Sequence, residues 1–200
     1  MYDAILSTVN SVFIYDNSNI NSFSTISQHG TIFLNILGIE PTEVSFLDDI
    51  SHQSGHVIFN VLTIKTEIFL TCPTSSLVSD ILTKLKDHRK VYGLFHGLFT
   101  YRCILITLHK YVENENLYKH EALARIGFYL GKMYVDLNII NDLNVLTEDG
   151  TTYYKESLNL YKYLFNKYAN FFRSITYANQ SYIFDYSRYV ELNPLKIKKI

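Results

Sequence analysis

Two histidines one helical turn apart are the residues of this sequence best suited to chemistry. His52 and His56 stand just before an apolar run, residues 57–64. Residues four apart lie on the same face of an α-helix, so both imidazoles can reach one point in space. Imidazole nitrogens are common ligands of zinc, iron and copper. The spacing therefore predicts a metal site, and it suits two half-buried histidines without a metal equally well.

The residue after the first histidine decides which metal chemistry is open to such a pair. The same spacing occurs in the HExxH motif of zinc hydrolases, where the glutamate takes a proton from the metal-bound water. Here that position is Gln53, and an amide cannot accept the proton. The sequence therefore argues against a zinc peptidase, whereas metal binding remains open.

The histidine pair needs a helix to position it. Asp48 and Asp49 stand just ahead of His52, and a helix N-terminus favours aspartate as a cap and as a negative charge. We therefore expect a helix that begins there and continues to about residue 66. If the chain folds back at this point, either aspartate is also available as a carboxylate ligand.

The rest of the chain is predicted to be mainly α-helical and to form one domain over residues 1–200. Apolar spacing predicts helices over about 77–86 (capped by Ser75 or Ser76), 92–113, 117–141 and 153–177, with a cap and turn at Thr147 and Gly150. A further short element is expected near the C-terminus. Short strands are expected at most near 31–37 and 66–71.

Composition excludes several classes of function. The net charge is −1 with acidic and basic residues interspersed, so a nucleic-acid partner is not expected. Neither a signal peptide nor a membrane-spanning segment is expected, because residues 1–5 lack a basic region and no uninterrupted apolar run reaches the roughly 18 residues that span a membrane. Cys72 and Cys103 are too few for a disulfide scaffold. We expect a soluble cytoplasmic protein.

A third histidine lies in the most apolar segment of the sequence. His96 is flanked by Phe95 and Gly97 inside the helix predicted over 92–113. A buried histidine needs a hydrogen-bond partner or a metal. Glycine costs about 1 kcal/mol in a helix interior relative to alanine, so Gly97 predicts the close approach of another helix or of a ligand. Taken alone, His96 is more often a hydrogen-bonded core histidine.

Three stretches of the chain resemble one family, the 2-oxoglutarate-dependent HExxH-type peptide β-hydroxylases, also described as HExxH motif-containing putative peptide modification proteins. The stretches are residues 52–56, residues 94–97 and the segment from 121–125 to 146–150, in the order expected for the family. Gln53 stands where the family usually has glutamate. The resemblance implies an enzyme with Fe(II), 2-oxoglutarate and dioxygen that β-hydroxylates a residue of a ribosomally synthesised precursor peptide.

The resemblance also implies a set of metal ligands, namely His52, His56 and His96. An all-histidine set differs from the usual two histidines and one carboxylate of such iron sites. Glu67 is an unsuitable carboxylate, because it would lie about 16 Å beyond His56 along an ideal helix. Gln53 would hydrogen-bond behind the ligands, since an oxygenase needs no carboxylate base at that position.

The distal carboxylate of 2-oxoglutarate would need a cation. Arg102 is favoured because an unpaired guanidinium in an apolar helix would be costly, and Arg125 is the competing choice. The alternative function is a peptide-binding scaffold of the same family, in which Gln53 marks lost chemistry. The other histidines lack a companion at ligand spacing and are predicted to be structural or exposed: His29, His88, His109 and His120.

Overall fold

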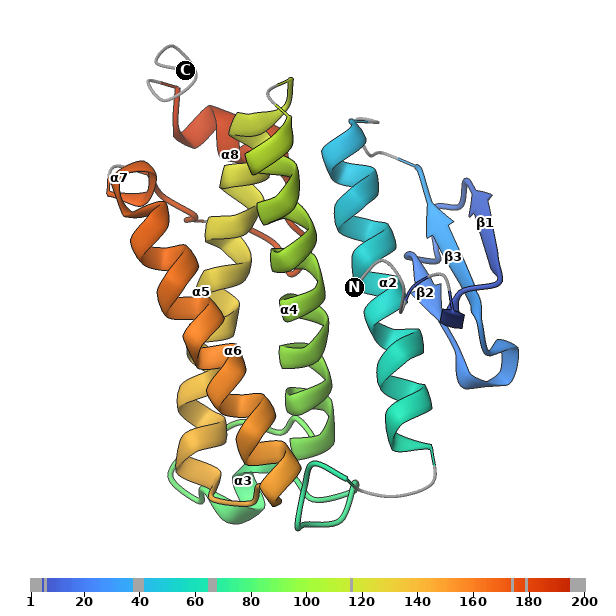
Figure 1. Cartoon of the computed structure of the whole chain (residues 1–200), viewed down its shortest axis with the longest axis vertical. Helices are drawn as coiled ribbons and strands as arrows, with labels where there is room; N and C mark the ends of the chain where they lie inside the picture. Colours follow the sequence, from blue (N-terminus) through green and yellow to red (C-terminus); the bar gives the residue numbers. More distant parts are fainter. Residues whose placement is uncertain are drawn as a thin grey trace.

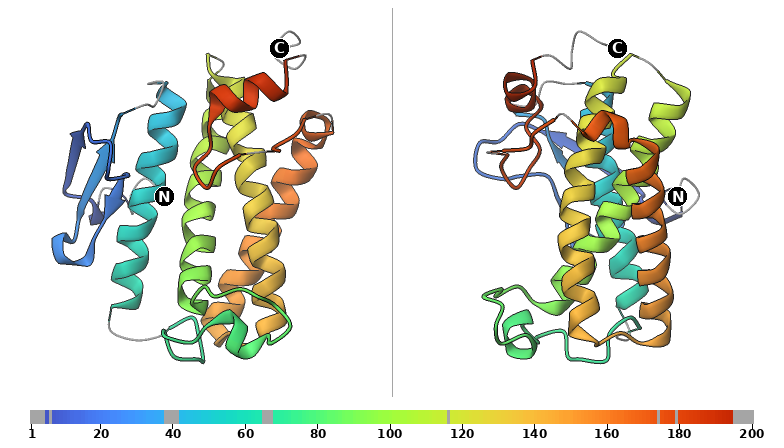
Figure 2. Two further views of the ribbon diagram at one scale, coloured as in Figure 1. Left: turned by 180° about the vertical axis from the view of Figure 1, so that it is seen from behind. Right: turned by 90° about the vertical axis from the view of Figure 1, so that its left-hand side faces the viewer.

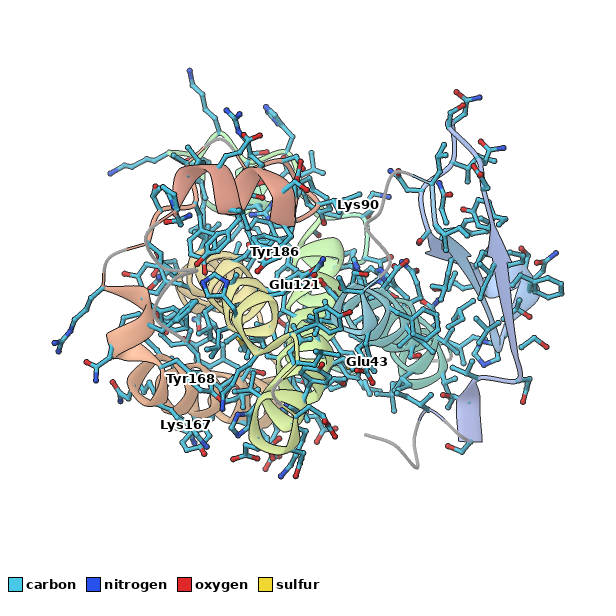
Figure 3. The ribbon with its side chains drawn as sticks, turned by 90° about the horizontal axis from the view of Figure 1, so that it is seen from above. Glu43, Lys90, Glu121, Lys167, Tyr168 and Tyr186 are labelled. Atoms are coloured by element: carbon cyan, nitrogen blue, oxygen red, sulfur yellow. The ribbon has the colours of Figure 1, made fainter. Side chains whose placement is uncertain are left out.

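Four long helices and a small sheet make up the structure, a computed structural model that describes residues 5, 7–37, 42–64, 68–115, 117–173, 175–178 and 180–194. The long helices are α2 (Glu43–Thr63), α4 (Val91–Asn114), α5 (Lys119–Leu143) and α6 (Glu148–Lys167). They run roughly side by side, and the sheet covers the face of α2 that points away from α4 (Figure 1, Figure 3). The mainly α fold is therefore confirmed.

Helix α4 is the centre of the molecule. It packs against α2, α5 and α6, and its apolar side chains form much of the core. Its length and composition would allow it to cross a membrane, but 61% of its most apolar window is buried inside the protein. Packing against three neighbouring helices thus accounts for its apolar sequence.

The sheet consists of β1 (Ser11–Tyr15), β2 (Phe23–Ser24) and β3 (Thr31–Asn35) in the order β1-β3-β2, with the short 3-10 helix η1 (Ile26–Gln28) between β2 and β3. Strand β1 is parallel to β3, whereas β2 is antiparallel to it. Alternate residues of β3 are buried, and Ile32 and Leu34 pack with Val57 of α2. The apolar segment predicted near 31–37 is therefore a strand that covers the histidine helix.

Helix α2 begins earlier than the sequence suggested. Its cap is Thr42, whose hydroxyl accepts the backbone N–H of Ser45, while the Ser45 hydroxyl accepts the N–H of Thr42. This capping box satisfies the first backbone donors. Asp48 and Asp49 consequently lie in the second turn, so the prediction that the helix starts with them was wrong.

The boundaries predicted for the other helices and strands agree only partly with the structure. The helix expected over 77–86 is a single turn, α3 (Val78–Ile81), because the backbone leaves the helical conformation at Leu82 with φ −99° and ψ 75°. Helix α6 ends well before residue 177 and is followed by the short α7 (Ala169–Phe172). The Thr147 cap is confirmed, since its hydroxyl accepts the N–H of Gly150. Of the strand expected near 66–71, a single bridge joins Leu70 to Leu146, and residues 65–67 lie outside the described residues.

The C-terminal part of the chain returns over α5. The Tyr177 hydroxyl donates to the carbonyl of Ala124 at 2.8 Å, and the segment continues through Tyr182 to α8 (Tyr186–Leu192). Helix α8 is the expected short C-terminal element, and it lies across one end of α5 (Figure 2). This return brings residues near 182 to the rim of a cavity between α2, α4 and α5.

Candidate metal centre

The three histidines singled out in the sequence come together in the structure. His52 and His56 lie one turn apart on α2 with ring centroids separated by 4.8 Å. His96 on α4 faces His56, with 4.5 Å between ring centroids and 2.8 Å between His56 Nδ1 and His96 Nε2. One imidazole donates a hydrogen bond to the other. The ring of Phe59 stacks on His96 at 4.3 Å and fixes its plane.

A glycine allows the two helices to approach this closely. A Cβ atom on Gly55 would lie 3.2 Å from Thr100 Cα and 3.3 Å from Cys103 Sγ, closer than most real side-chain contacts. Gly55 therefore lets α4 close onto α2 beside His56. At Gly97, where the sequence predicted a close approach, a Cβ atom would make only ordinary contacts, at 3.6 Å to the Tyr101 hydroxyl of the same helix and at 3.7 Å to Asp136 Oδ2 of α5. Gly97 lines the cavity instead.

All three imidazoles are held in the neutral form. Burial lowers the pKa of His52 to about 4, helped by the charge of Lys132 and by His96. Burial likewise lowers the pKa of His56 and of His96 to about 3, and each is also disfavoured as a cation by a neighbouring histidine. Metal ligation requires the neutral imidazole. The histidines are therefore ready to bind a metal at neutral pH without first losing a proton.

The histidines stand in the wall of a cavity of about 590 Å³. Side chains from α2, α4 and α5, the segment around β2 and the C-terminal return line it. Among the described residues, no group of three or more His, Cys, Asp or Glu side chains is arranged to hold a metal ion as it stands. The donor types and their neutral state suit a metal, and the hydrogen bond between His56 and His96 would have to open for both to bind it.

A buried ion-pair cluster forms one side of the cavity. Arg125 donates to Asp48 Oδ2 at 2.7 Å, and to Glu121 Oε1 at 2.7 Å from Nη2 and 2.8 Å from Nε. Burial raises the pKa of Asp48, and the charge of Arg125 opposes that rise. Arg125 lines the cavity, as a ligand-binding arginine must. Its guanidinium, however, is paired with two carboxylates of the protein itself.

Asp49 and Gln53 link the histidine helix to the sheet. Asp49 accepts hydrogen bonds from the Ser22 hydroxyl and from Gln53 Nε2, the latter at 3.5 Å. Ser22 in turn accepts the backbone N–H of Asn35 at 2.8 Å. Gln53 Oε1 is buried and has no hydrogen-bond partner among the described residues. Asp48 and Asp49 therefore both serve other partners, and Glu67 lies outside the described residues.

Arg102 does not face the cavity. It follows His96 by six residues, which turns its side chain about 120° around α4, away from His96. Arg102 Nη2 binds Glu156 of α6 at 2.7 Å, and its guanidinium lies 4.7 Å from the ring centroid of Tyr153. The expectation that Arg102 holds the carboxylate of a co-substrate is therefore corrected, because its charge is directed to α6.

Lys132, a cation that the sequence patterns did not single out, lines the cavity. Lys132 on α5 lies seven residues after Arg125, two helical turns along the same face. Its Nζ donates to the carbonyl of Tyr182 at 2.6 Å and lies 3.7 Å from the centroid of the Tyr182 ring. Burial lowers the pKa of Lys132 to about 8. The sequence did contain a signal for Lys132, namely a lysine inside a largely apolar predicted helix, two turns after Arg125.

The remaining histidines lie outside the cavity. His109 is hydrogen-bonded to the Tyr168 hydroxyl at 2.7 Å, and His120 to the Tyr186 hydroxyl at 3.1 Å. His29 and His88 are exposed. Each therefore has the structural or surface position expected of it.

Comparison of the chain with protein-family models and with curated proteins returns no match. The chemical interpretation of the cavity consequently depends on its own residues and on the resemblance of the three sequence stretches.

Proposed function

We propose that this protein is an Fe(II)- and 2-oxoglutarate-dependent dioxygenase that β-hydroxylates a residue of a ribosomally synthesised peptide. The observation that carries the proposal is the gathering of His52, His56 and His96, all neutral, in the wall of one cavity. Imidazole ligands with room beside them for small molecules suit an iron oxygenase. A cavity of about 590 Å³ has the size of a small-molecule site.

Each residue of the site has a part in this function. His52, His56 and His96 would hold the metal, and Phe59 keeps the His96 ring in one plane. Fe(II) with 2-oxoglutarate would supply the activation of dioxygen for hydroxylation of a C–H bond. The hydrogen bond between Asp49 and Ser22 joins α2 to the segment before β2, and Asp49 also accepts a hydrogen bond from Gln53 within α2. Gln53 Oε1 is a free acceptor that can orient a neighbouring N–H or O–H donor.

A hydrolytic function finds less support from the same residues. Metal-assisted hydrolysis needs a base for the metal-bound water, and the amide of Gln53 cannot act as one. Asp49, one helical turn before Gln53 on α2, is hydrogen-bonded to Ser22 and Gln53. An oxygenase has no such requirement.

The rim of the cavity supports a peptide as the molecule modified. Apolar and aromatic side chains are exposed there, with Tyr182 at 74% and Ile183 at 55% of full exposure. Such side chains can contact a peptide on both sides of the residue that enters the cavity. Cys72 and Cys103 are free thiols, consistent with a reducing cytoplasm where precursor peptides are made.

The test begins with anaerobically purified protein. We expect it to bind Fe(II), to show a charge-transfer absorption band when 2-oxoglutarate is added, and to consume 2-oxoglutarate and dioxygen with its peptide. The peptide encoded by a neighbouring gene, when co-expressed, should gain the mass of one oxygen atom. Peptide binding without iron binding or turnover would instead identify a scaffold, a function favoured by the direct hydrogen bond between His56 and His96.

A further inference from the structure

Lys132 is a cation in the cavity wall that the protein itself does not neutralise. In the described part of the chain, no carboxylate oxygen lies within ion-pair distance of its Nζ, which donates to the Tyr182 carbonyl. The ammonium lies among three aromatic rings, 3.7 Å from the centroid of Tyr182, 4.9 Å from Phe128 and 5.7 Å from Tyr101. An ammonium carries three N–H donors, so donors remain for a ligand in the cavity.

The two carboxylates whose charges act on Lys132 are already occupied. Asp136 accepts from Arg89 Nη1 at 2.9 Å, and Asp48 accepts from Arg125 at 2.7 Å. The other oxygen of each aspartate takes no part in these ion pairs, but neither carboxylate lies within ion-pair distance of Lys132 Nζ in the described part of the chain. A half-buried charge without a strong partner is costly, and an incoming anion would offset that cost.

Lys132 and the three histidines line the same cavity. Gly93 and Gly97 lie on one face of α4 beside His96, and both line the cavity. A Cβ atom on Gly93 would meet no atom within 4 Å. At Gly97 the nearest atom to a Cβ would be the hydroxyl oxygen of Tyr101, at 3.6 Å. Asp136 Oδ2 would lie at 3.7 Å from the same position, so the space beside Gly97 is bordered by one hydroxyl and one carboxylate. The two glycines thus leave this part of the cavity wall without side chains, in the same cavity that His96 and Lys132 line.

We propose that Lys132 binds a carboxylate of a small dicarboxylic ligand whose other end lies at His52, His56 and His96. The inference deepens the proposed function and rests on it for the identity of the ligand, 2-oxoglutarate. It replaces both arginines considered from the sequence, since Arg102 binds Glu156 and Arg125 binds Asp48 and Glu121.

The experiment compares two keto acids of the same length. 2-Oxoglutarate carries the distal carboxylate, whereas 2-oxopentanoate has a methyl group in its place. Their affinities are measured by calorimetry for the wild type and for Lys132→Met, Lys132→Arg and Arg102→Ala, without metal and with Zn(II) as a redox-inert substitute. Circular dichroism and a thermal melt check that each variant is folded.

The wild type should bind 2-oxoglutarate at least about tenfold more tightly than 2-oxopentanoate, as expected for a charge-assisted contact. Lys132→Met should abolish this preference without weakening 2-oxopentanoate, and Lys132→Arg should retain part of it. Arg102→Ala should match the wild type, because Arg102 lies outside the cavity.

Equal affinities for the two keto acids in the wild type, including the absence of any binding, would overturn the inference. An undiminished preference in folded Lys132→Met would overturn it as well. If the proposed function is wrong but this inference is right, the experiment gives a different result. In that case a Lys132-dependent preference for the dicarboxylate would persist in the metal-free protein, while iron binding and hydroxylation were missing.

Discussion

His56 Nδ1 and His96 Nε2 lie 2.8 Å apart, although 40 positions separate the two residues in the sequence. At this distance one ring donates its proton to the lone pair of the other. A metal that binds both nitrogens must therefore displace this hydrogen bond. If the proposed metal binds, the pair would change from a hydrogen-bonded to a ligating arrangement.

Removal of one histidine should abolish tight metal binding. For His96→Ala we expect the affinity for Fe(II) or Zn(II) to fall by about a hundredfold or more, since even residues behind metal ligands contribute tenfold to a hundredfold. Competition with a chromophoric chelator measures the affinity. His109→Gln is the matched control, because His109 lies on the same helix but binds Tyr168. Unchanged affinity in His96→Ala would exclude His96 as a ligand.

A side chain at Gly55 should separate the two histidine helices. Gly55→Val would press against Thr100 and Cys103, and overpacking of this kind costs about 1–3 kcal/mol. Urea unfolding measures the free energy, and metal affinity should fall with it. Gly131→Ala is the control, since a Cβ there meets no atom within 4 Å and alanine favours a helix by about 1 kcal/mol. The interpretation of Gly55 fails if its valine variant is as stable as the wild type.

Arg125 should be important for stability. Arg125→Met leaves the buried carboxylates of Asp48 and Glu121 without their cation, a loss of about 3–5 kcal/mol in comparable buried pairs. Arg102→Ala removes a pair with the more exposed Glu156 and should cost less than about 1 kcal/mol from the ion pair. Urea midpoints compare the two variants. Similar losses in both would contradict the assignment of Arg125 to a buried cluster.

The metal-free protein should lose stability in mild acid. The folded pKa values of His52, His56 and His96, about 4, 3 and 3, lie below 6.5, the value of a free histidine. As the pH falls below 6.5, the unfolded chain takes up protons that the folded chain does not, so unfolding becomes easier. Urea midpoints between pH 7.5 and 5.5, roughly one unit around the free value, measure the slope.

A variant identifies the source of that slope. In His52→Gln, one of the three groups is removed and the slope should decrease. Burial raises the pKa of Asp48 and Asp49, which acts in the opposite direction and is unchanged in this variant. An identical slope in wild type and variant would show that His52 is not buried as described.

Gln53→Glu should not create a peptidase. The new carboxylate would be buried beside Asp49, which now accepts a hydrogen bond from Gln53, so we expect mutual repulsion and a less stable protein at neutral pH. Incubation of the zinc-loaded variant with an unstructured protein, followed by mass spectrometry, tests for cleavage. Specific cleavage products would instead favour a zinc hydrolase.

Local features of the structure could be predicted from the sequence. Helices α4 and α5 are long apolar segments, and their positions were predicted to within a few residues because hydrophobic spacing is a local property. The pairing of His52 with His56 depends only on the pitch of one helix. The Thr147 cap depends on a side chain and a backbone group three residues apart.

Only the tertiary structure decided which side chains share the cavity. The angle at which α4 and α5 face α2 depends on packing between distant segments, and it placed Lys132 in the cavity wall. The pitch of α4 turns Arg102 away from His96, and the packing of α6 gives Arg102 its partner Glu156. His96 on α4 can contact His56 because Gly55 on α2 has no side chain that would hold the two helices apart. Local spacing thus determined one pair of candidate ligands. His96 was named from the resemblance, but its contact with this pair and the position of Lys132 at the cavity depend on packing between distant helices, which local sequence patterns do not reveal.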